Sequence, residues 1–190
     1  DEEHFESVLA KYVKKYGFEN TVTGILYPFL EKIGVLWLTG SVTPAHEHFI
    51  TNLIRQKLIA TIAALPLPPK NSKRAMLYLP EGEMHELGLL FNHYVARHHG
   101  FRTFYLGQSL PHEDLKKIYE THRPHILITS LTTTPAHDML EEYLKTLSND
   151  FSNATILASG WLLRNTAFRV PKNVKLFDKV SELPLLLKSH

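Results

Sequence analysis

The chain of 190 residues has no cysteine, so it can form neither disulfides nor thiolate metal sites. It also lacks any uninterrupted apolar stretch of about 20 residues, which a membrane-spanning helix would need. Its start, Asp-Glu-Glu-His, does not resemble a signal peptide. Lysines and arginines are nearly balanced by acids, and the net charge of +2 leaves no basic footprint for nucleic acid. These absences predict a cytoplasmic protein that avoids membranes and does not hold DNA by itself.

Several catalytic signatures are missing as well. The segment His85–Leu89 has no second histidine where a zinc-protease helix would place one. His46 and His48 are two residues apart and would point to different faces of a helix. Neither a glycine-rich phosphate loop nor a nucleophile elbow is found. The sequence therefore predicts a binding module and not an enzyme.

What the sequence does contain is a first part with helical periodicity. From residue 3 to about 66, apolar residues recur at steps of three and four. Pro28 should kink the second helix or reset its first turns, and Gly40 should end it. Thr43 as a cap and Pro44 as the first helical residue should start a third helix. Residues 1–66 are therefore expected to form a helical bundle. Because such bundles usually contain four helices, a further helix is expected upstream of residue 1.

The second part alternates strands with helices after a proline-rich linker over residues 67–73. Strands are expected at 74–80, 102–107, 125–130, 154–159 and 174–177, and helices at 87–99, 112–122, 136–148, 161–168 and 180–188. Five such units predict an α/β domain over residues 74–190. Its sheet should be parallel, doubly wound and five-stranded, with strand order 2-1-3-4-5.

Loops that follow the first, third and fourth strands should meet on one rim of that sheet. The first of them contains the pattern Glu83-x-His85-x-x-Gly88. A carboxylate two residues before a histidine can hold one ring nitrogen and leave the other for a metal. Gly88 near the helix start would let a bulky flat ligand approach the backbone. By spacing alone, an exposed loop histidine without a ligand fits as well.

In this position, the acid-x-His-x-x-Gly pattern resembles that of the flavodoxin-like cobalamin-binding modules, in which it also follows a helical bundle. In that superfamily the histidine replaces the vitamin's own dimethylbenzimidazole as the lower axial ligand of cobalt. The displaced nucleotide tail enters a slot beside the first strand. The resemblance implies that His85 is the cobalt ligand and that Glu83 and Gly88 belong to the cofactor site.

Two further motifs of the superfamily are present in altered form. Ser130 and Thr132 stand where a Ser-x-Leu motif lines the slot for the tail, with threonine in place of leucine. Ser159 and Gly160 stand where a Gly-Gly pair is usual, with serine in place of the first glycine. The serine adds a side chain where the tail normally meets bare backbone.

The helical part resembles a particular subfamily. Trp37 is followed after nine residues by Glu47-His48, which is similar to the bundle motif of MerR-like cobalamin-dependent regulators, the light-responsive repressors of carotenoid genes. Their bundle caps the upper corrin face. The resemblance implies that Trp37 packs on an upper adenosyl group, that Glu47 accepts hydrogen bonds from its ribose and that His48 lies nearby. Without it, Trp37 fits a bundle core and Glu47 a first-turn acid favoured by the helix dipole.

The light-sensing members carry a second histidine after the tryptophan, and this chain has Leu38 there. A histidine above cobalt after photolysis would then have to be His46 or His48, and a light-independent sensor stays open. The predicted function is a cobalamin-binding sensory module of a transcriptional regulator. Adenosylcobalamin is the expected form and methylcobalamin the alternative. The module is expected to form homo-oligomers and to contact DNA only through a domain outside this chain. A corrinoid carrier for methyl transfer and a degenerate domain without the vitamin are the rival hypotheses.

Overall fold

A computed structural model describes residues 1–190 except 39, 165–166 and 190, and leaves the side chains at 31, 34, 35, 37 and 38 undescribed. The chain divides into two compact units, residues 1–57 and 58–190, and each unit is described by itself. The expected domain limits, 1–66 and 74–190, stay a prediction.

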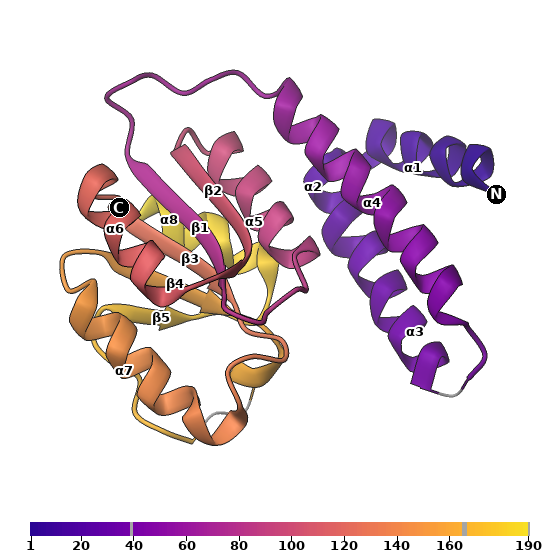
Figure 1. Ribbon diagram of the computed structural model, residues 1–190. Coiled ribbons are helices and arrows are strands. Elements are labelled where there is room, and N and C mark those ends of the chain that lie inside the picture. The colour runs from indigo at the N-terminus through magenta and orange to yellow at the C-terminus, as the bar shows by residue number, and fades with distance from the viewer. Residues whose placement is uncertain (39, 165–166, 190) are drawn as a thin grey trace. The chain divides into compact units, whose positions relative to one another are not determined.

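Four α-helices build the N-terminal region (Figure 1). They are α1 (Glu2–Tyr16), α2 (Phe18–Thr21), α3 (Tyr27–Leu38) and α4 (Pro44–Ala64). A π-helical turn, Val22–Leu26, joins α2 to α3 immediately before Pro28. Proline has no N–H to donate to the carbonyl four residues earlier, and a wider π turn accommodates that loss. The predicted disturbance at Pro28 is therefore confirmed.

The start of α4 follows the predicted capping chemistry. The backbone N–H of His46 donates to Oγ1 of Thr43 over 3.4 Å, and that oxygen lies 3.0 Å from Nδ1 of His46. Pro44 is the first helical residue, where its missing N–H costs nothing. Within the first unit, Lys57 of α4 forms an ion pair with Glu6 of α1. The buried side chains of this unit are Leu9, Thr21, Val22, Leu26, Leu53 and Ile54.

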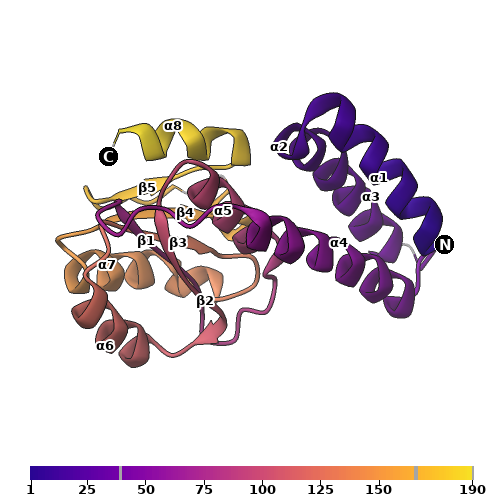
Figure 2. The ribbon, with the colours of Figure 1, turned by 90° about the horizontal axis from the view of Figure 1, so that it is seen from above.

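The second unit holds a five-stranded parallel sheet with strand order β2-β1-β3-β4-β5. Its strands are β1 (Arg74–Pro80), β2 (Arg102–Leu110), β3 (Ile126–Ser130), β4 (Thr155–Ser159) and β5 (Val174–Leu176). Its helices are α5 (Leu87–His98), α6 (His112–His122), α7 (Leu140–Asp150) and α8 (Leu183–Lys188). In Figure 2, α5 and α8 cover one face of the sheet and α6 and α7 cover the other. The predicted doubly wound topology is thus confirmed.

Burial on both faces explains why the central strands are almost continuously apolar. Residues 75–80 of β1 and all of β3 are buried, as expected for parallel strands covered by helices on either side. One core cluster includes Met76, Leu127 and Ile156 from the strands and Leu115, Leu144 and Leu147 from α6 and α7. None of the described helices is long and apolar enough to cross a membrane.

The expected helix at 161–168 is wrong for its described residues; positions 165–166 lie outside them. Only Trp161–Leu163 forms a single 3₁₀ turn, and Arg164 after it has extended backbone angles. The N–H of Leu162 donates to the carbonyl of Leu131 over 3.1 Å, which ties this segment to the loop after β3. The guanidinium of Arg164 also binds Asp178 over 2.7 Å. These contacts tie the turn to the loop after β3 and to the segment after β5.

Smaller differences concern the ends of elements. A 3₁₀ turn at His137–Met139 directly precedes α7, and another at Val180–Glu182 directly precedes α8. Strand β2 continues to Leu110, beyond the expected end at 107, because its register with β1 shifts near Gly107. Gly107 has a φ of 78°, which a glycine adopts without steric cost. This irregularity carries the end of β2 toward the loop that follows β1.

Candidate functional site

The carboxyl ends of the parallel strands form the rim where the candidate residues of the second unit gather. Loops after β1, β3 and β4 all leave this edge, because every strand pair is parallel. Strands β1 and β3 are neighbours, but β1 is followed by α5 on one face and β3 by α7 on the other (Figure 2). Such a switch in direction leaves a crevice at the rim of doubly wound sheets, where ligands bind.

Glu83 is the polar centre of this rim and is completely buried. Its Oε2 accepts from the backbone N–H groups of Thr132, Thr133 and Thr134 over 2.9, 2.6 and 3.1 Å. Its Oε1 accepts from the N–H of His85 over 3.0 Å and lies 2.6 Å from Nδ1 of the same residue. One carboxylate therefore ties the loop after β1 to the loop after β3.

These hydrogen bonds fix the charge of Glu83 and the tautomer of His85. Burial alone would raise the pKa of the Glu83 carboxyl, but the backbone N–H of Thr133 and the hydrogen bonds from His85 and Thr132 outweigh it and lower that pKa to about 2. The carboxylate is ionised at neutral pH and can only accept, so Nδ1 of His85 carries the proton. The lone pair of His85 then lies on Nε2.

His85 is presented to the outside on a fixed loop. Its side chain is 59% exposed, and Nε2 makes no hydrogen bond to a described residue. The irregular end of β2 braces the loop: Gln108 donates to the carbonyl of Met84 over 2.6 Å, and Ser109 receives the N–H of Gly82 on its Oγ over 3.1 Å. The imidazole is thus oriented before any ligand arrives.

In the part of the chain that the structure describes, no three histidine, aspartate or glutamate side chains are grouped so that they could hold a metal. His85 could therefore offer a metal a single bond. A structural or catalytic zinc ion needs three or four protein ligands. The chemistry at His85 fits a metal that brings most of its own ligands.

The loops after β3 and β4 touch one another closely. Ser130 and Ser159 are paired in the register of β3 and β4, and both are buried. The N–H of Leu131 donates to the carbonyl of Ser159 over 2.7 Å. Gly160 has a φ of 119°, and a Cβ there would lie 2.3 Å from the carbonyl oxygen of Leu131. Only glycine fits this position, so the structure explains why this half of the altered pair is glycine.

A cavity of about 490 Å³ lies beside Gly160. It is lined by Gly160, Leu163, Arg164, Leu176, Phe177, Asp178 and Glu182. The ends of β4 and β5 and the start of the last helical segment therefore line an open hollow at the carboxyl ends of the strands, the same edge of the sheet as His85. Its volume lies within the range of small-molecule sites.

An apolar rim formed by Met84, Met139 and Trp161 was missed by sequence reasoning. The three side chains come from the loops after β1, β3 and β4, and each is more than half exposed, Trp161 by 67%. Each of these side chains therefore offers apolar surface at the carboxyl ends of the strands that an apolar partner could contact. The sequence held a signal, because Met84 lies between Glu83 and His85 and Trp161 directly follows Gly160.

The predicted site residues of the second unit lie at the carboxyl ends of the strands. The predicted site residues of the first unit are described relative to that unit alone. Thr132 binds Glu83 through its backbone, and Gly88 lies in the first turn of α5. In the first unit, Glu47 is half-buried in the first turn of α4, and its carboxylate lies 3.5 Å from Nε2 of the exposed His48. The side chain of Trp37 lies outside the described residues.

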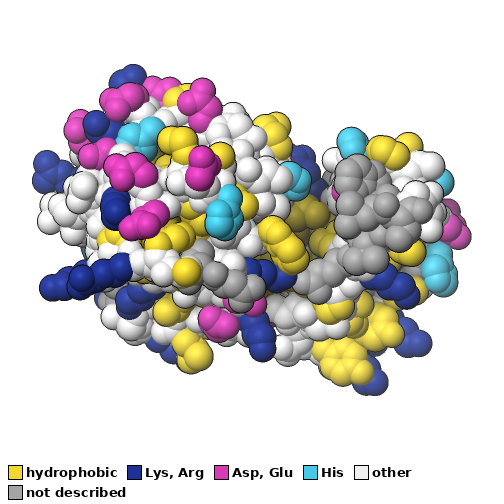
Figure 3. Space-filling model, turned by 90° about the horizontal axis from the view of Figure 1, so that it is seen from below, with side chains coloured by type: hydrophobic (Ala, Val, Ile, Leu, Met, Phe, Trp, Pro, Cys, Tyr) yellow, Lys and Arg dark blue, Asp and Glu magenta, His cyan; other side chains and the backbone are white. Residues whose placement is uncertain are grey.

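Figure 3 shows acidic and basic side chains on the same visible face, with apolar side chains between them. This mixture agrees with the near balance of charges in the sequence.

Comparison with known proteins gives matches in both parts of the chain. Residues 1–61 match the family of the B12 binding domain. The HTH-type transcriptional repressor CarH of Myxococcus xanthus is 32% identical over 123 residues, which are 65% of this chain and 40% of that protein. The repressor CarA of the same organism is 31% identical over 122 residues, 64% of this chain and 40% of CarA. The match thus spans about two fifths of the length of these relatives.

Two solved structures show the same fold. A monomethylamine corrinoid protein of Methanosarcina barkeri superposes with a TM-score of 0.75 at 11% identity, over 96% of this chain and 89% of that one. The methanol:cobalamin methyltransferase complex of the same organism gives 0.54 at 13% identity, over 100% of this chain and 74% of that one. The resemblance that the motifs predicted is confirmed: residues 1–61 match the B12 binding domain family, and about two thirds of the chain is similar to the CarH and CarA repressors.

Proposed function

We propose that this chain is the cobalamin-binding sensory part of a transcriptional regulator and that His85 is the lower axial ligand of cobalt. The observation that supports this proposal most is the hydrogen bond between the buried, ionised Glu83 and the exposed His85, with Nδ1 of His85 2.6 Å from Oε1 of Glu83. The B12 binding domain match and the CarH and CarA relatives support the choice of ligand and of regulator.

The residues of the rim fit this cofactor. Cobalamin, when bound, would supply a cobalt ion that already carries most of its ligands, so that one protein nitrogen would be enough to hold it. His85 offers one nitrogen, and Glu83 makes that nitrogen a better donor by accepting from Nδ1. Met84, Met139 and Trp161 offer apolar contacts to the underside of a large flat ring.

The cavity beside Gly160 is our candidate for the nucleotide tail. Gly160 lines this cavity, whereas Ser130, Thr132 and Ser159 precede Gly160 in the chain and do not line the cavity. The candidate space therefore lies at the ends of β4 and β5, and not beside β1, where the resemblance places the tail. The roles of these four residues toward the tail are part of the proposal.

The upper face of the corrin is assigned by resemblance to residues of the first unit. Trp37 would cover an adenosyl group, Glu47 would accept from its ribose hydroxyls, and His48 would lie nearby. The half-buried carboxylate of Glu47 is available for such bonds, because the exposed His48 is its only neighbour at ion-pair distance among described residues. Binding would have to differ in affinity between two assembly states in order to control a regulator.

Absorption spectroscopy tests this proposal. The chain should bind hydroxocobalamin and adenosylcobalamin with the spectrum of the base-off, histidine-ligated form. His85→Ala should lose that spectrum, while His137→Ala should keep it, because His137 is an exposed histidine of the loop after β3 on the same rim. A His85→Ala spectrum identical to that of the unchanged chain would remove His85 from cobalt, and failure of the unchanged chain to bind would favour a degenerate domain.

A further inference from the structure

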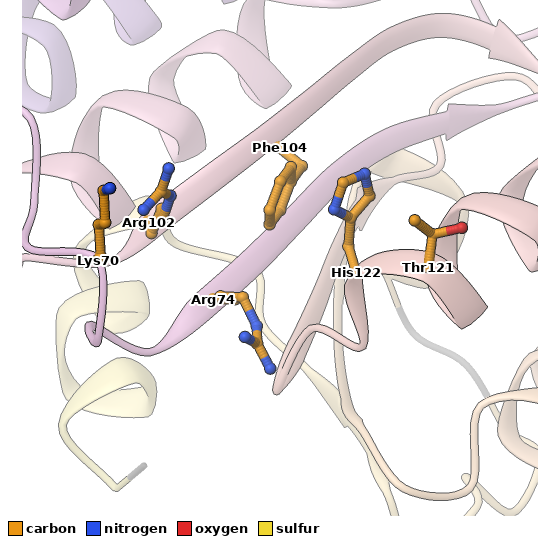
Figure 4. A pocket seen from close by; sticks show the side chains of 6 residues that line it. All are labelled: Lys70, Arg74, Arg102, Phe104, Thr121 and His122. Atoms are coloured by element: carbon orange, nitrogen blue, oxygen red, sulfur yellow. The ribbon is translucent and has the colours of Figure 1, made fainter.

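A second pocket opens at the amino ends of the strands, away from the rim that holds His85. We call it the basal pocket, and it is lined by Lys70, Arg74, Arg102, Phe104, Thr121 and His122 (Figure 4). Arg74 and Arg102 are the first residues of β1 and β2 and are paired in register. Because β1 has seven residues, roughly 20 Å of strand separate this pocket from the carboxyl rim.

The charge of the basal pocket is positive and uncompensated. Lys70, Arg74 and Arg102 line it together with one histidine, and no aspartate or glutamate does. None of the three cations forms an ion pair with a carboxylate among the described residues. Elsewhere in the second unit, lysines such as Lys117 and Lys145 are paired with an acid one helical turn away. Cations concentrated in a concave site without counter-charges attract anions.

One side-chain N–H group of Arg74 has no acceptor among the described residues. Its Nη2 donates to the carbonyl of Arg123 over 3.1 Å, and its backbone N–H donates to Nδ1 of His125 over 3.1 Å. Its Nε is buried and has no hydrogen-bond partner among the described residues. A buried donor that stays unpaired destabilises the folded state. An acceptor oxygen from a bound anion would satisfy it.

A stacked pair of rings forms a firm wall of the pocket. The rings of Phe104 and His122 lie 4.3 Å apart at an interplanar angle of 29°. Figure 4 shows the two rings next to each other, with Lys70 and Arg102 on the side of Phe104 and Thr121 beyond His122. The hydroxyl of Thr121 donates to the carbonyl of Lys117 over 3.1 Å, so its oxygen can still accept. Lys70 and Arg102 thus lie beside the ring pair, whereas the guanidinium of Arg74 points toward the carbonyl of Arg123.

We propose that the basal pocket binds a small anion that carries at least two phosphate groups. Its cavity of about 290 Å³ is near the lower limit for small-molecule sites. A polyphosphate group matches three permanent cations in charge, and arginine in particular binds phosphate oxygens through two parallel N–H groups. This site is separate from cobalamin and does not depend on the function proposed above.

Calorimetric titration of the whole chain with inorganic pyrophosphate tests the basal pocket. Saturable binding is expected, and it should weaken as salt is added. The double variant Lys70→Gln/Arg102→Gln should bind about tenfold more weakly or worse, because charge-assisted hydrogen bonds are lost. The control Lys172→Gln/Lys188→Gln removes the same charge from other exposed positions of this unit and should bind like the unchanged chain. Lys70 and Arg102 are both exposed, and a thermal melt checks that the double variant stays folded.

Several outcomes would overturn the proposal. They are the absence of pyrophosphate binding, an equal loss in both double variants, and sulfate binding as tightly as pyrophosphate. If the Lys70/Arg102 variant changed the oligomeric state but not the pyrophosphate affinity, the pocket would be a protein contact instead. His85→Ala should leave the pyrophosphate affinity unchanged, and a loss there would place the anion at the cobalamin rim.

Discussion

Glu83 shows how much a single side chain organises at this rim. Five of its hydrogen bonds come from His85 and from the backbone of Thr132, Thr133 and Thr134. The sequence predicted its bond to the imidazole, because the two residues are neighbours in one loop. It could not predict the three backbone donors, which lie about 50 residues away and are brought close only by the pairing of β1 with β3.

Gly160→Ala is expected to destabilise the second unit by about 3 kcal/mol, because the new Cβ would meet backbone atoms of Leu131 that cannot move aside. Gly100→Ala is the matched control. Gly100 also has a positive φ, of 83°, but a Cβ there would meet no atom within 4 Å, so a loss of about 1 kcal/mol is expected. Urea unfolding of both variants measures the difference, and equal losses would show that the Leu131 contact has no steric effect.

At the scale of elements, the hydrophobic periodicity of the sequence and the positions of its prolines and glycines were enough to locate the strands and most helices. Strand β1 and helix α6 occupy the expected residues, and the π turn lies where Pro28 required an adjustment. The prediction at 161–168 failed because the local pattern is helical, whereas the segment forms one 3₁₀ turn and then an extended residue at Arg164. The donor of Leu162 goes to Leu131, a partner that no local pattern reveals.

His93 joins α5 to β2 and should make the second unit sensitive to acid. Its Nε2 lies 2.8 Å from Oγ1 of Thr103, and its ring stacks on Tyr105 at 5.0 Å. Burial, and then the charge of Arg97, lowers the pKa of His93 from 6.5 to about 4. The unfolded chain therefore takes up this proton more readily than the folded one, so the stabilisation is complete above pH 6.5 and is lost as the pH falls toward 4.

Between pH 7 and pH 4, this titration should reduce the free energy of unfolding by roughly 3 kcal/mol. His93→Gln can keep a hydrogen bond to Thr103 but cannot titrate, so its unfolding free energy should vary less over the same interval. Urea unfolding across this pH range makes the comparison. A variant with the same pH dependence as the unchanged chain would show that His93 is not responsible.

At the scale of the whole molecule, the functional prediction rested on the order of the helical region and the α/β region along the chain. A helical region with Trp37 and Glu47-His48, followed by a doubly wound sheet with His85 in its first loop, predicted the regulator relatives that the comparisons then gave. The apolar rim of Met84, Met139 and Trp161 was missed, since exposure is a property of the folded chain and hydrophobic periodicity predicts burial.

Two tryptophans allow the proposed roles of the two units to be separated. Trp37→Ala should weaken adenosylcobalamin binding more than hydroxocobalamin binding, because only the former carries the large upper ligand that Trp37 would cover. Trp161→Ala, which changes the rim of the second unit, should weaken both forms by a similar factor. Spectroscopic titration gives the four affinities. Equal losses of both forms in Trp37→Ala would mean that this side chain has only a structural role.

The most direct test of the account is the identity of the nitrogen bound to cobalt. Cobalamin bound to the chain would first be reduced to its cobalt(II) form. The complex should then give an electron paramagnetic resonance spectrum in which one axial nitrogen splits the cobalt lines into triplets. Labelling the protein with ¹⁵N-histidine should turn those triplets into doublets, because the nuclear spin changes from one to one half, and His85→Ala should abolish the change. Triplets that persist in the labelled protein would show that the ligand is the cofactor's own base, and would contradict the assignment of His85 to cobalt.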